Sequence, residues 1–518
     1  MRFLKILDTY RLGLLVFFGK VAVFSTLRDP DYYWHLKTGE IILAEGRLPK
    51  TDPFSFTRPG SPWVLHEWLF QVILYLVHRA GGPWAVRALM AGLAAAAVVF
   101  AGRTARLFLP SKNAVLLVSL PFMVYLAVGV SPRPQLVTYV FLSFLIYALF
   151  QEKYAGKPRL LGLVPLLMVA WVNAHAGYMM GIVLLWLFAV CEAVRLRLHG
   201  PVPHGDRGRL YRLAMVAAAA AAASTINPYF IEHWLYPFQV SAMWASTHFI
   251  SEWQSPNFHG LLDKGYLGLI ALWVVFLVFN RQKPDVTELA VPAVVVLLSF
   301  QAVRHMPLVA LVLISHCALS LSRGFDDAWP LRPLQAAWQR YKQGKGRGSR
   351  ELGDLEYVFN WILLGVAGVA AYGLYPTWAA GEPLRLNSLL PVDAVEFVER
   401  EGVRGRVFNT YHFGGYLIFK FYPDQKVFVD GRADMYGDEF LKEYDVMYRG
   451  KPGWEDAFDP YGIDYVVCER NAPIRQLLIA RGDFRLVYDD ESNSVLVKDV
   501  PKFRSLILRH EIKPIHAP

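Results

Sequence analysis

The sequence is poor in charge and in cysteine. Only 19% of its 518 residues are charged and 54% are hydrophobic, with a mean hydropathy of +0.29. This composition excludes an ordinary soluble domain. The three cysteines, Cys191, Cys317 and Cys468, lie far apart, which argues against a disulfide framework or a cysteine-ligated metal site. No small-residue cleavage site follows the first apolar run, so we expect that run to persist as a span.

Long apolar runs dominate residues 1–377. A membrane span needs about 20 apolar residues, with about 17 as a practical minimum. Eleven runs qualify or nearly qualify: 11–27, 84–102, 114–130, 136–151, 160–174, 178–195, 212–227, 265–280, 286–303, 306–322 and 357–376. The run 66–79 is shorter and contains His66, Glu67 and His78, so we expect a helix at the membrane interface, with a twelfth span as the alternative. The chain is therefore predicted to be a polytopic α-helical membrane protein of about eleven spans.

The net charge of +10 does not indicate a nucleic-acid partner, because many Lys and Arg residues lie in short loops between apolar runs. Cations in short loops mark the cytoplasmic side of a membrane protein. With a cytoplasmic N-terminus, six segments on that side carry 23 Lys and Arg residues: 1–11, 103–112, 152–159, 195–212, 281–285 and 323–350. The first loop, 28–83, and the chain beyond residue 377 are then predicted to lie outside the plasma (inner) membrane.

Residues 378–518 differ in pattern from the apolar part. Helix-like stretches at 391–401 and 438–448 alternate with strand-like stretches at 406–408, 426–429, 464–467, 484–488 and 494–498. Such alternation is typical of a small α/β domain, and the length suits one independent core. We expect an extracytoplasmic α/β domain.

The polar residues that could carry chemistry fall mainly on the predicted outer face. Asp29 and Asp31 follow the first span, where a carboxylate could act as a general base or bind Mg²⁺ or Mn²⁺. Arg133 lies between two prolines, and Arg304 lies with His305 in a two-residue turn; an arginine there could bind phosphate through paired hydrogen bonds. The further candidates for substrate binding are His66, Glu67, His175, Glu252, Asp430 and Arg432.

Several of these candidates also have a structural explanation. Asp29 could cap a helix that begins near Tyr32. Arg133 could extend to lipid headgroups, and His175 could cap a turn between two spans. The remaining alternatives are surface hydrogen bonds for His66 with Glu67, and an internal ion pair for Asp430 with Arg432.

The motifs of the first loop and the outer domain resemble those of the GT-C class of membrane glycosyltransferases. That class includes oligosaccharyltransferases, protein O-mannosyltransferases and lipid A aminoarabinose transferases. The resemblance is strongest to a group of bacterial members and covers nearly the whole chain. It is carried by DPDYYWHL at 29–36, DPFSFT at 52–57, WVLHEWL at 63–69 and VDGRADMYG at 429–437.

The resemblance implies transfer of a sugar from a polyprenyl-phosphate-linked donor to a lipid, glycan or protein acceptor at the outer face, among membrane lipids. It assigns the role of base or metal ligand to Asp31 first and Asp29 second. The segment 249–252, which contains Glu252, is similar to a Glu-bearing motif of oligosaccharyltransferases. The segment 411–416 lacks the Asp of their sequon-reading motif, and the loop 131–135 lacks their second acidic metal motif. Metal dependence is therefore open.

Two other functions are compatible with the same composition. A transporter of lipid-linked sugars would need a site near the middle of the membrane, where the predicted spans are nearly free of charge. A non-catalytic scaffold whose outer domain binds a partner would make Asp29 and Asp31 dispensable.

Overall fold

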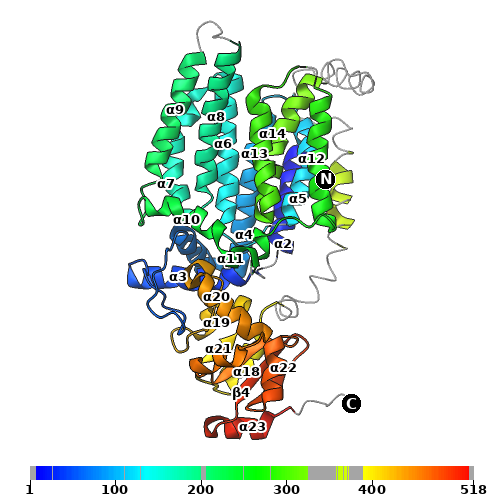
Figure 1. The fold of residues 1–518 in the computed structure, drawn as a ribbon. Coiled ribbons are helices and arrows are strands. Elements are labelled where there is room, and N and C mark those ends of the chain that lie inside the picture. Colours follow the sequence, from blue (N-terminus) through cyan, green and yellow to red (C-terminus); the bar gives the residue numbers. More distant parts are fainter. Residues whose placement is uncertain are drawn as a thin grey trace.

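The computed structural model describes residues 8–25, 27, 29–109, 111–128, 130–199, 206–248, 250–280, 282–324, 358, 360–365, 367–369, 372 and 389–512. The predicted connection 323–350 lies outside these residues except for its first two, and the predicted span 357–376 is only partly described. A helical bundle forms one end of the molecule and the C-terminal α/β domain forms the other, with α3 (Pro30–Glu45), α10 (Glu232–Ala242) and α11 (Trp244–His248) between them (Figure 1).

Ten of the eleven predicted apolar runs are helical. They form α2 (Thr9–Phe24), α4 (Trp68–Ala105), α5 (Lys112–Val128), α6 (Gln135–Ala155), η1 (Pro158–Leu163) with α7 (Val164–Ala174), α8 (Tyr178–His199), α9 (Asp206–Ala223), α12 (Leu261–Val278), α13 (Val286–Gln301) and α14 (Met306–Gly324). Five helices in the described part are long and apolar enough to cross a membrane: 68–105, 135–155, 178–198, 261–278 and 303–323. The count of eleven spans stays a prediction.

The predicted border between an interfacial helix and the second span is a kink within α4. Gly81 (φ −153°, ψ 20°) and Gly82 (φ 61°, ψ −155°) leave helical geometry just before Pro83. The positive φ at Gly82 suits glycine, and Pro83 has no N–H to donate to the preceding turn. The helix therefore changes direction there, between residues 68–80 and 84–105.

Ion pairs join three of the segments that were predicted on the cytoplasmic side, and a further pair joins the start of a fourth to the first turn of α13. Lys153 pairs with Asp285 at 2.7 Å, and Arg323 pairs with Glu288 at 2.6 Å. Arg212 pairs with Glu152 at 2.5 Å. These segments therefore lie together at one end of the bundle, as expected; which end faces the cytoplasm stays a prediction.

The C-terminal domain contains a four-stranded sheet in the order β1-β2-β4-β3. Its strands are β1 (Val407–Asn409), β2 (Tyr465–Glu469), β3 (Phe484–Asp489) and β4 (Asn493–Lys498). Strand β1 runs parallel to β2, with Val407 opposite Tyr465, and the other two pairings are antiparallel. The helices are α18 (Val392–Arg400), α19 (Gly414–Phe421), α20 (Ala433–Arg449), α21 (Trp454–Phe458), α22 (Pro473–Arg481) and α23 (Arg504–His510). The expected α/β domain is therefore present.

One predicted strand, 426–429, is wrong. Its residues are not part of the sheet; Val427 forms a single parallel bridge with Ser55 of the first loop. Its N–H donates to the carbonyl of Phe54 at 3.0 Å, and its carbonyl accepts from Phe56 N at 3.1 Å. The stretch is apolar because it is buried under the first loop, which attaches that loop to the outer domain.

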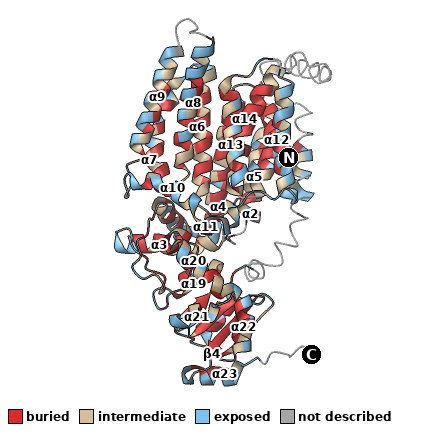
Figure 2. Ribbon diagram, in the orientation of Figure 1, coloured by how far each residue is buried: buried red, intermediate tan, exposed pale blue. Residues whose placement is uncertain are grey.

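Buried apolar residues form two separate cores, visible as red segments in the bundle and in the outer domain (Figure 2). The second core contains Trp34 of α3 (Pro30–Glu45) together with Phe54 and Trp63 of the first loop. The first loop thus packs with the C-terminal domain, although it is separated from it in sequence by the whole bundle. The charged residues of the first loop are held where the bundle and the outer domain meet.

Candidate functional site

Four charged residues from three segments meet between the bundle and the outer domain. We call Asp29, Asp31, Glu252 and Arg133 the acidic cluster. Arg133 lies 3.2 Å from Asp31 (Nη2 to Oδ2) and 2.7 Å from Glu252 (Nη1 to Oε2), and its Nε pairs with Asp29. The sequence predicted each residue as a site candidate, and the structure brings all four together.

The two aspartates of the first loop differ in surroundings. Asp29 is the N-cap of α3: its Oδ1 accepts from the backbone N–H of Asp31 at 3.0 Å. The capping role considered for Asp29 is therefore confirmed, and its side chain is only 6% exposed. The side chain of Asp31 is 23% exposed and that of Glu252, in η2 (Ser251–Trp253), is 30% exposed. Asp31 is the aspartate that a ligand can reach.

Asp31 is also held from the side of the outer domain. Its Oδ1 accepts from Trp34 Nε1 at 3.0 Å. A Cβ added to Gly431 would lie 2.0 Å from the same Oδ1, so a larger residue there would force this carboxylate or the loop to shift. The orientation of Asp31 thus depends on a loop 400 residues away in sequence.

The surroundings of Asp31 favour its protonated form. Burial raises the pKa of Asp31 to about 7, and Asp29 adds to the rise, while the guanidinium of Arg133 opposes it. A carboxylate that titrates near neutral pH is suited to accept a proton from a substrate.

A second group, the Glu67 cluster, consists of Glu67, His35, His66 and His175. The Nε2 atoms of these histidines lie 3.7 Å (His35), 3.2 Å (His66) and 4.0 Å (His175) from the Glu67 carboxylate. Of the four, His66, Glu67 and His175 were predicted as site candidates. The two clusters are contiguous, because the ring of His35 lies against that of Trp34, with 3.8 Å between centroids, and Trp34 donates to Asp31.

Hydrogen bonds orient the histidines of the Glu67 cluster. Nδ1 of His175 accepts from the backbone N–H of Gly177 at 3.1 Å, so in the neutral ring Nε2 carries the hydrogen toward Glu67. His175 is also the C-cap of α7, as its alternative explanation predicted. Burial lowers the pKa of His175 to about 3 and that of His35 to about 4, which keeps both rings neutral.

His66 and Glu67 form the charged pair of this cluster. Burial opposes ionisation of both groups, but each lies beside the other's opposite charge. The pKa of Glu67 is therefore lowered by His66 and the other imidazoles, and that of His66 is raised by the carboxylate. The outer domain closes this side through Asp434, which accepts from Tyr236 of α10 (Glu232–Ala242) at 3.1 Å.

Arg304 borders the acidic cluster from η3 (Val303–His305). Its guanidinium carbon lies 4.4 Å from the ring centre of Trp253, the neighbour of Glu252. Val303 N donates to the carbonyl of Gln254 at 3.0 Å, which fixes η3 against η2. No ion pair of Arg304 with a carboxylate is present among the described residues. His305 instead contacts the carbonyl of Leu298 through Nδ1 at 3.1 Å.

The structure places Asp430 and Arg432 away from any exposed surface. Arg432 pairs with Asp430 at 2.6 Å and with Asp52 of the first loop at 2.7 Å, and no side chain of the three is more than 1% exposed where these pairs form. Tyr436 also donates to Asp430 at 2.8 Å. The internal ion pair considered as the alternative is therefore what the structure contains, and it joins the outer domain to the first loop.

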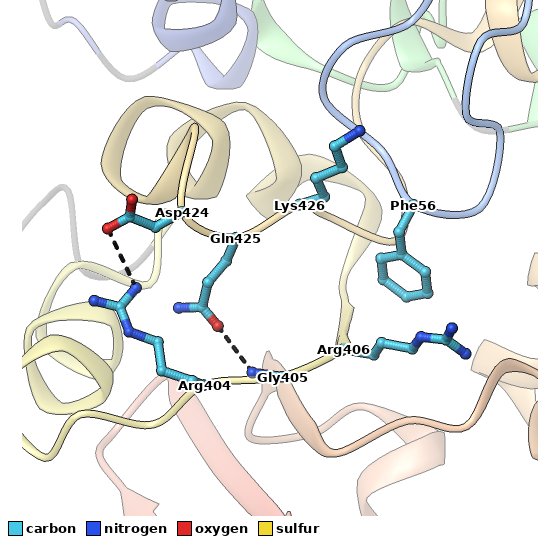
Figure 3. A pocket seen from close by; sticks show the side chains of 7 residues that line it. All are labelled: Phe56, Arg404, Gly405, Arg406, Asp424, Gln425 and Lys426. Atoms are coloured by element: carbon cyan, nitrogen blue, oxygen red, sulfur yellow. Dashed lines mark hydrogen bonds and ion pairs between the residues drawn. The ribbon is translucent and has the colours of Figure 1, made fainter.

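A cavity of about 600 Å³ lies elsewhere on the outer domain (Figure 3). Its lining combines three cations, Arg404, Arg406 and Lys426, with one carboxylate, Asp424, and the ring of Phe56. The side chain of Gln425 points toward Gly405, and its Oε1 accepts from Gly405 N at 3.2 Å (Figure 3). This composition suits an anionic ligand, and none of these residues was a predicted candidate.

Three residues that shape the site were also missing from the predicted set. Trp34 and His35 stood within the first-loop motif, where an aromatic residue beside a histidine equally fits a membrane interface. Gly431 stood between two predicted residues, but its contact with Asp31 needs the folded chain. For each of these three residues, the surrounding motif was the only signal in the sequence.

No model of a known protein family matches the sequence, and no curated protein matches it. Solved structures do match the fold. The archaeal oligosaccharyltransferase AglB from Archaeoglobus fulgidus, in complex with an inhibitory peptide and a dolichol-phosphate, aligns with a TM-score of 0.54 and 11% identity, over 89% of this chain and 69% of AglB. ArnT from Cupriavidus metallidurans in the apo state aligns with a TM-score of 0.50 and 13% identity, over 93% of this chain and 96% of ArnT.

The resemblance to GT-C glycosyltransferases is therefore confirmed at the level of the fold. The shared part covers both the helical bundle and most of the outer domain, since about nine tenths of the chain aligns. At these identities the likeness concerns the fold, and the chemistry has to be argued from the two clusters.

Proposed function

We propose that this chain is an integral-membrane glycosyltransferase that moves a sugar from a polyprenyl-phosphate-linked donor to a lipid, glycan or protein acceptor at the extracytoplasmic face of the plasma (inner) membrane. The observation that carries the proposal is the acidic cluster. It holds a partly exposed carboxylate with a pKa near 7, and it borders an arginine that has no carboxylate partner among the described residues. The fold shared with AglB, which was solved with a dolichol-phosphate, supports a lipid-phosphate donor.

Asp31 and Arg304 have separate parts in the proposed reaction. Asp31 accepts the proton of the acceptor hydroxyl or amide as that group attacks the anomeric carbon of the sugar. The bond between this carbon and the phosphate oxygen breaks, and the negative charge goes to the lipid phosphate that leaves. The N–H groups of the Arg304 guanidinium bind that phosphate, while the ring of Trp253 lies against the face of the guanidinium.

Transfer by the purified protein tests this function. Short-chain polyprenyl-phosphate sugars would be supplied with extracted envelope acceptors, and labelled product would be measured in wild type, Arg304→Lys and Arg304→Ala. Lysine keeps the charge but loses the planar pair of donors, so transfer should fall in Arg304→Lys and fall further in Arg304→Ala. Arg79→Ala is the matched control, because Arg79 is an exposed arginine that lies just before the α4 kink and outside both clusters. Full activity in Arg304→Ala would contradict the phosphate role.

Cysteine labelling tests the location of the outer domain. All three native cysteines are buried, so they contribute little background. A membrane-impermeant maleimide on intact cells should label Glu491→Cys in the outer domain, but not Lys157→Cys in the predicted cytoplasmic loop; both positions are exposed. The reverse pattern would place the acidic cluster in the cytoplasm and contradict the proposed donor side.

A further inference from the structure

The carboxylates of the acidic cluster are of the type that binds hard divalent cations. Mg²⁺ and Mn²⁺ take carboxylate oxygens as ligands, at about 2.0–2.2 Å. Asp29, Asp31 and Glu252 converge from two distant segments, as a metal site would require. Within the described ranges, however, no three acidic, histidine or cysteine side chains are arranged to hold a metal ion.

A guanidinium occupies the point on which these carboxylates converge. Each nitrogen of Arg133 faces a different carboxylate: Nε faces Asp29, Nη2 faces Asp31 at 3.2 Å, and Nη1 faces Glu252 at 2.7 Å. The positive charge that a metal would supply is therefore already present. Arginine stays protonated at any physiological pH, so this charge is permanent.

The oxygens of the two aspartates that turn away from Arg133 are occupied as well. The second oxygen of Asp29 accepts from the backbone N–H of Asp31, and the second oxygen of Asp31 accepts from Trp34 Nε1, both at 3.0 Å. Three of the four aspartate oxygens thus accept hydrogen bonds from N–H groups, and the fourth, Oδ2 of Asp31, lies 3.2 Å from Nη2 of Arg133. A metal cation bound between the two aspartates would have to displace Arg133. It would also be repelled by the N–H groups of Asp31 and Trp34, whose hydrogens point toward the carboxylates.

The chain delivers Arg133 to this point from a stiff connection. Pro132 and Pro134 restrict the backbone on both sides, and Arg133 N donates to the carbonyl of Ser131 at 2.8 Å. The helix α6 begins directly afterwards, at Gln135. Arg304 brings a second positive charge to the neighbourhood of Glu252 through its contact with Trp253.

We infer that Arg133 is the built-in cation of this site, and that the chain arranges its carboxylates without a divalent metal ion. Arg133 is a positioning residue: it holds Asp29 and Glu252 in place and orients Asp31. The metal-binding part of this inference concerns the folded chain alone, whereas the catalytic part rests on the proposed function.

Electron paramagnetic resonance of Mn²⁺ tests the inference on the full-length protein, purified in detergent and freed of metal with EDTA. Wild type should bind no stoichiometric Mn²⁺, and its transfer activity should be the same in EDTA as in Mg²⁺. Arg133→Ala leaves three carboxylates without their cation, so it should acquire one Mn²⁺ site while transfer falls about 10²-fold through loss of orientation. Arg79→Ala, which leaves the cluster intact, should bind no Mn²⁺.

Two results would overturn the inference. One is a stoichiometric Mn²⁺ site in wild type that is lost in Asp31→Asn; this measurement needs no variant of Arg133, so it decides even if Arg133→Ala does not fold. The other is a folded Arg133→Ala protein that binds no Mn²⁺, because Arg133 would then not stand in a cation's place. The Mn²⁺ resonance measurement needs no sugar donor. Absence of transfer with every donor would therefore count against the proposed function and not against the role of Arg133 as the built-in cation.

Discussion

Two arginines, Arg133 and Arg432, are each held by carboxylates from distant parts of the sequence, but they differ in access. Arg432 and its partners Asp430 and Asp52 are at most 1% exposed, and the guanidinium also lies 4.6 Å from the ring centre of Trp63. Arg133 is 18% exposed, and its partner Asp31 is 23% exposed. The first group is sealed inside the outer core, and the second is open to a ligand.

The difference separates charges that join two parts of the fold from charges that stay accessible. A buried ion pair gains little net stability, since its charges lose water, but removing one partner is costly. The Arg432 group therefore fixes how the first loop attaches to the outer domain. The Arg133 group also combines an arginine with carboxylates, three in place of two, but it keeps Asp31 and Glu252 accessible. Separate variants in the two groups should separate activity from stability.

Asp31→Asn should give the largest loss of activity. Asparagine keeps the size of the side chain but cannot serve as a base, so transfer should fall about 10²–10⁴-fold. At neutral pH thermal unfolding should not occur below the wild-type temperature, because the raised pKa of Asp31 means that its ionised form costs the folded state stability. The control is Asp456→Asn, an exposed aspartate of the outer domain. Near-native turnover would show that Asp31 is structural and would favour a scaffold over an enzyme.

Asp430→Asn should show the opposite pattern. Loss of this carboxylate leaves Arg432 buried with one charged partner, Asp52, and leaves a single oxygen at residue 430 to accept from Arg432 and Tyr436. Breaking a buried pair costs about 3–5 kcal/mol, so the midpoint of thermal unfolding should fall clearly. The fraction that remains folded should retain its turnover per molecule. A stable Asp430→Asn protein that has lost transfer would return Asp430 to the substrate site.

Gly431→Ala joins the two groups, because Gly431 stands next to Arg432 and faces Asp31. The new Cβ would lie 2.0 Å from Oδ1 of Asp31, so either the carboxylate or the loop must move. A displacement of about 1 Å at a catalytic group can cost about 10²-fold in rate, and we expect a loss of that order at most. Gly268→Ala is the control, since a Cβ at Gly268 would meet nothing within 4 Å. Equal activity of the two variants would mean that the orientation of Asp31 is unimportant.

The sequence predicted most of the fold because its signals are local. Apolar runs of span length and strand–helix alternation identified ten helical runs and four strands. The failure at 426–429 has a physical cause: apolar strand-like residues are buried whether they join a sheet or lie under a loop. Here the partner is Ser55, which is more than 370 residues away, and no local pattern records that contact.

The site was predicted as a set of residues and not as an arrangement. Asp31, Arg133 and Glu252 were chosen because polar groups gathered on one predicted face, whereas Arg133 is separated by 104 residues from Asp29 and by 119 from Glu252. Arg133 was expected to bind a substrate phosphate, and its three carboxylate neighbours emerge only from packing. The same limit hid the contact of Gly431, because the closeness of two backbones is a tertiary property.

The pH dependence of transfer is the smallest but most specific of the expected effects, because it compares Asp31 of the Arg133 group with an ordinary carboxylate. A base must be ionised, and burial together with Asp29 raises the pKa of Asp31 to about 7 against the opposing charge of Arg133. Below pH 7, kcat/KM should therefore rise about tenfold per unit, whereas an unperturbed aspartate, with a pKa of about 3.9, would already be ionised. Asp29→Asn still caps α3 but removes the like charge, so it should move this limb to lower pH.

The stability of the folded state should change with pH in the opposite sense. Between pH 4 and 7 the folded chain binds the proton of Asp31 more tightly than the unfolded chain does, so this residue makes stability fall as pH rises. Asp31→Asn removes that slope. A kcat/KM profile that is flat from pH 5 to 8 in wild type, with protein that stays folded throughout, would show that no group with the raised pKa of Asp31 acts as the base.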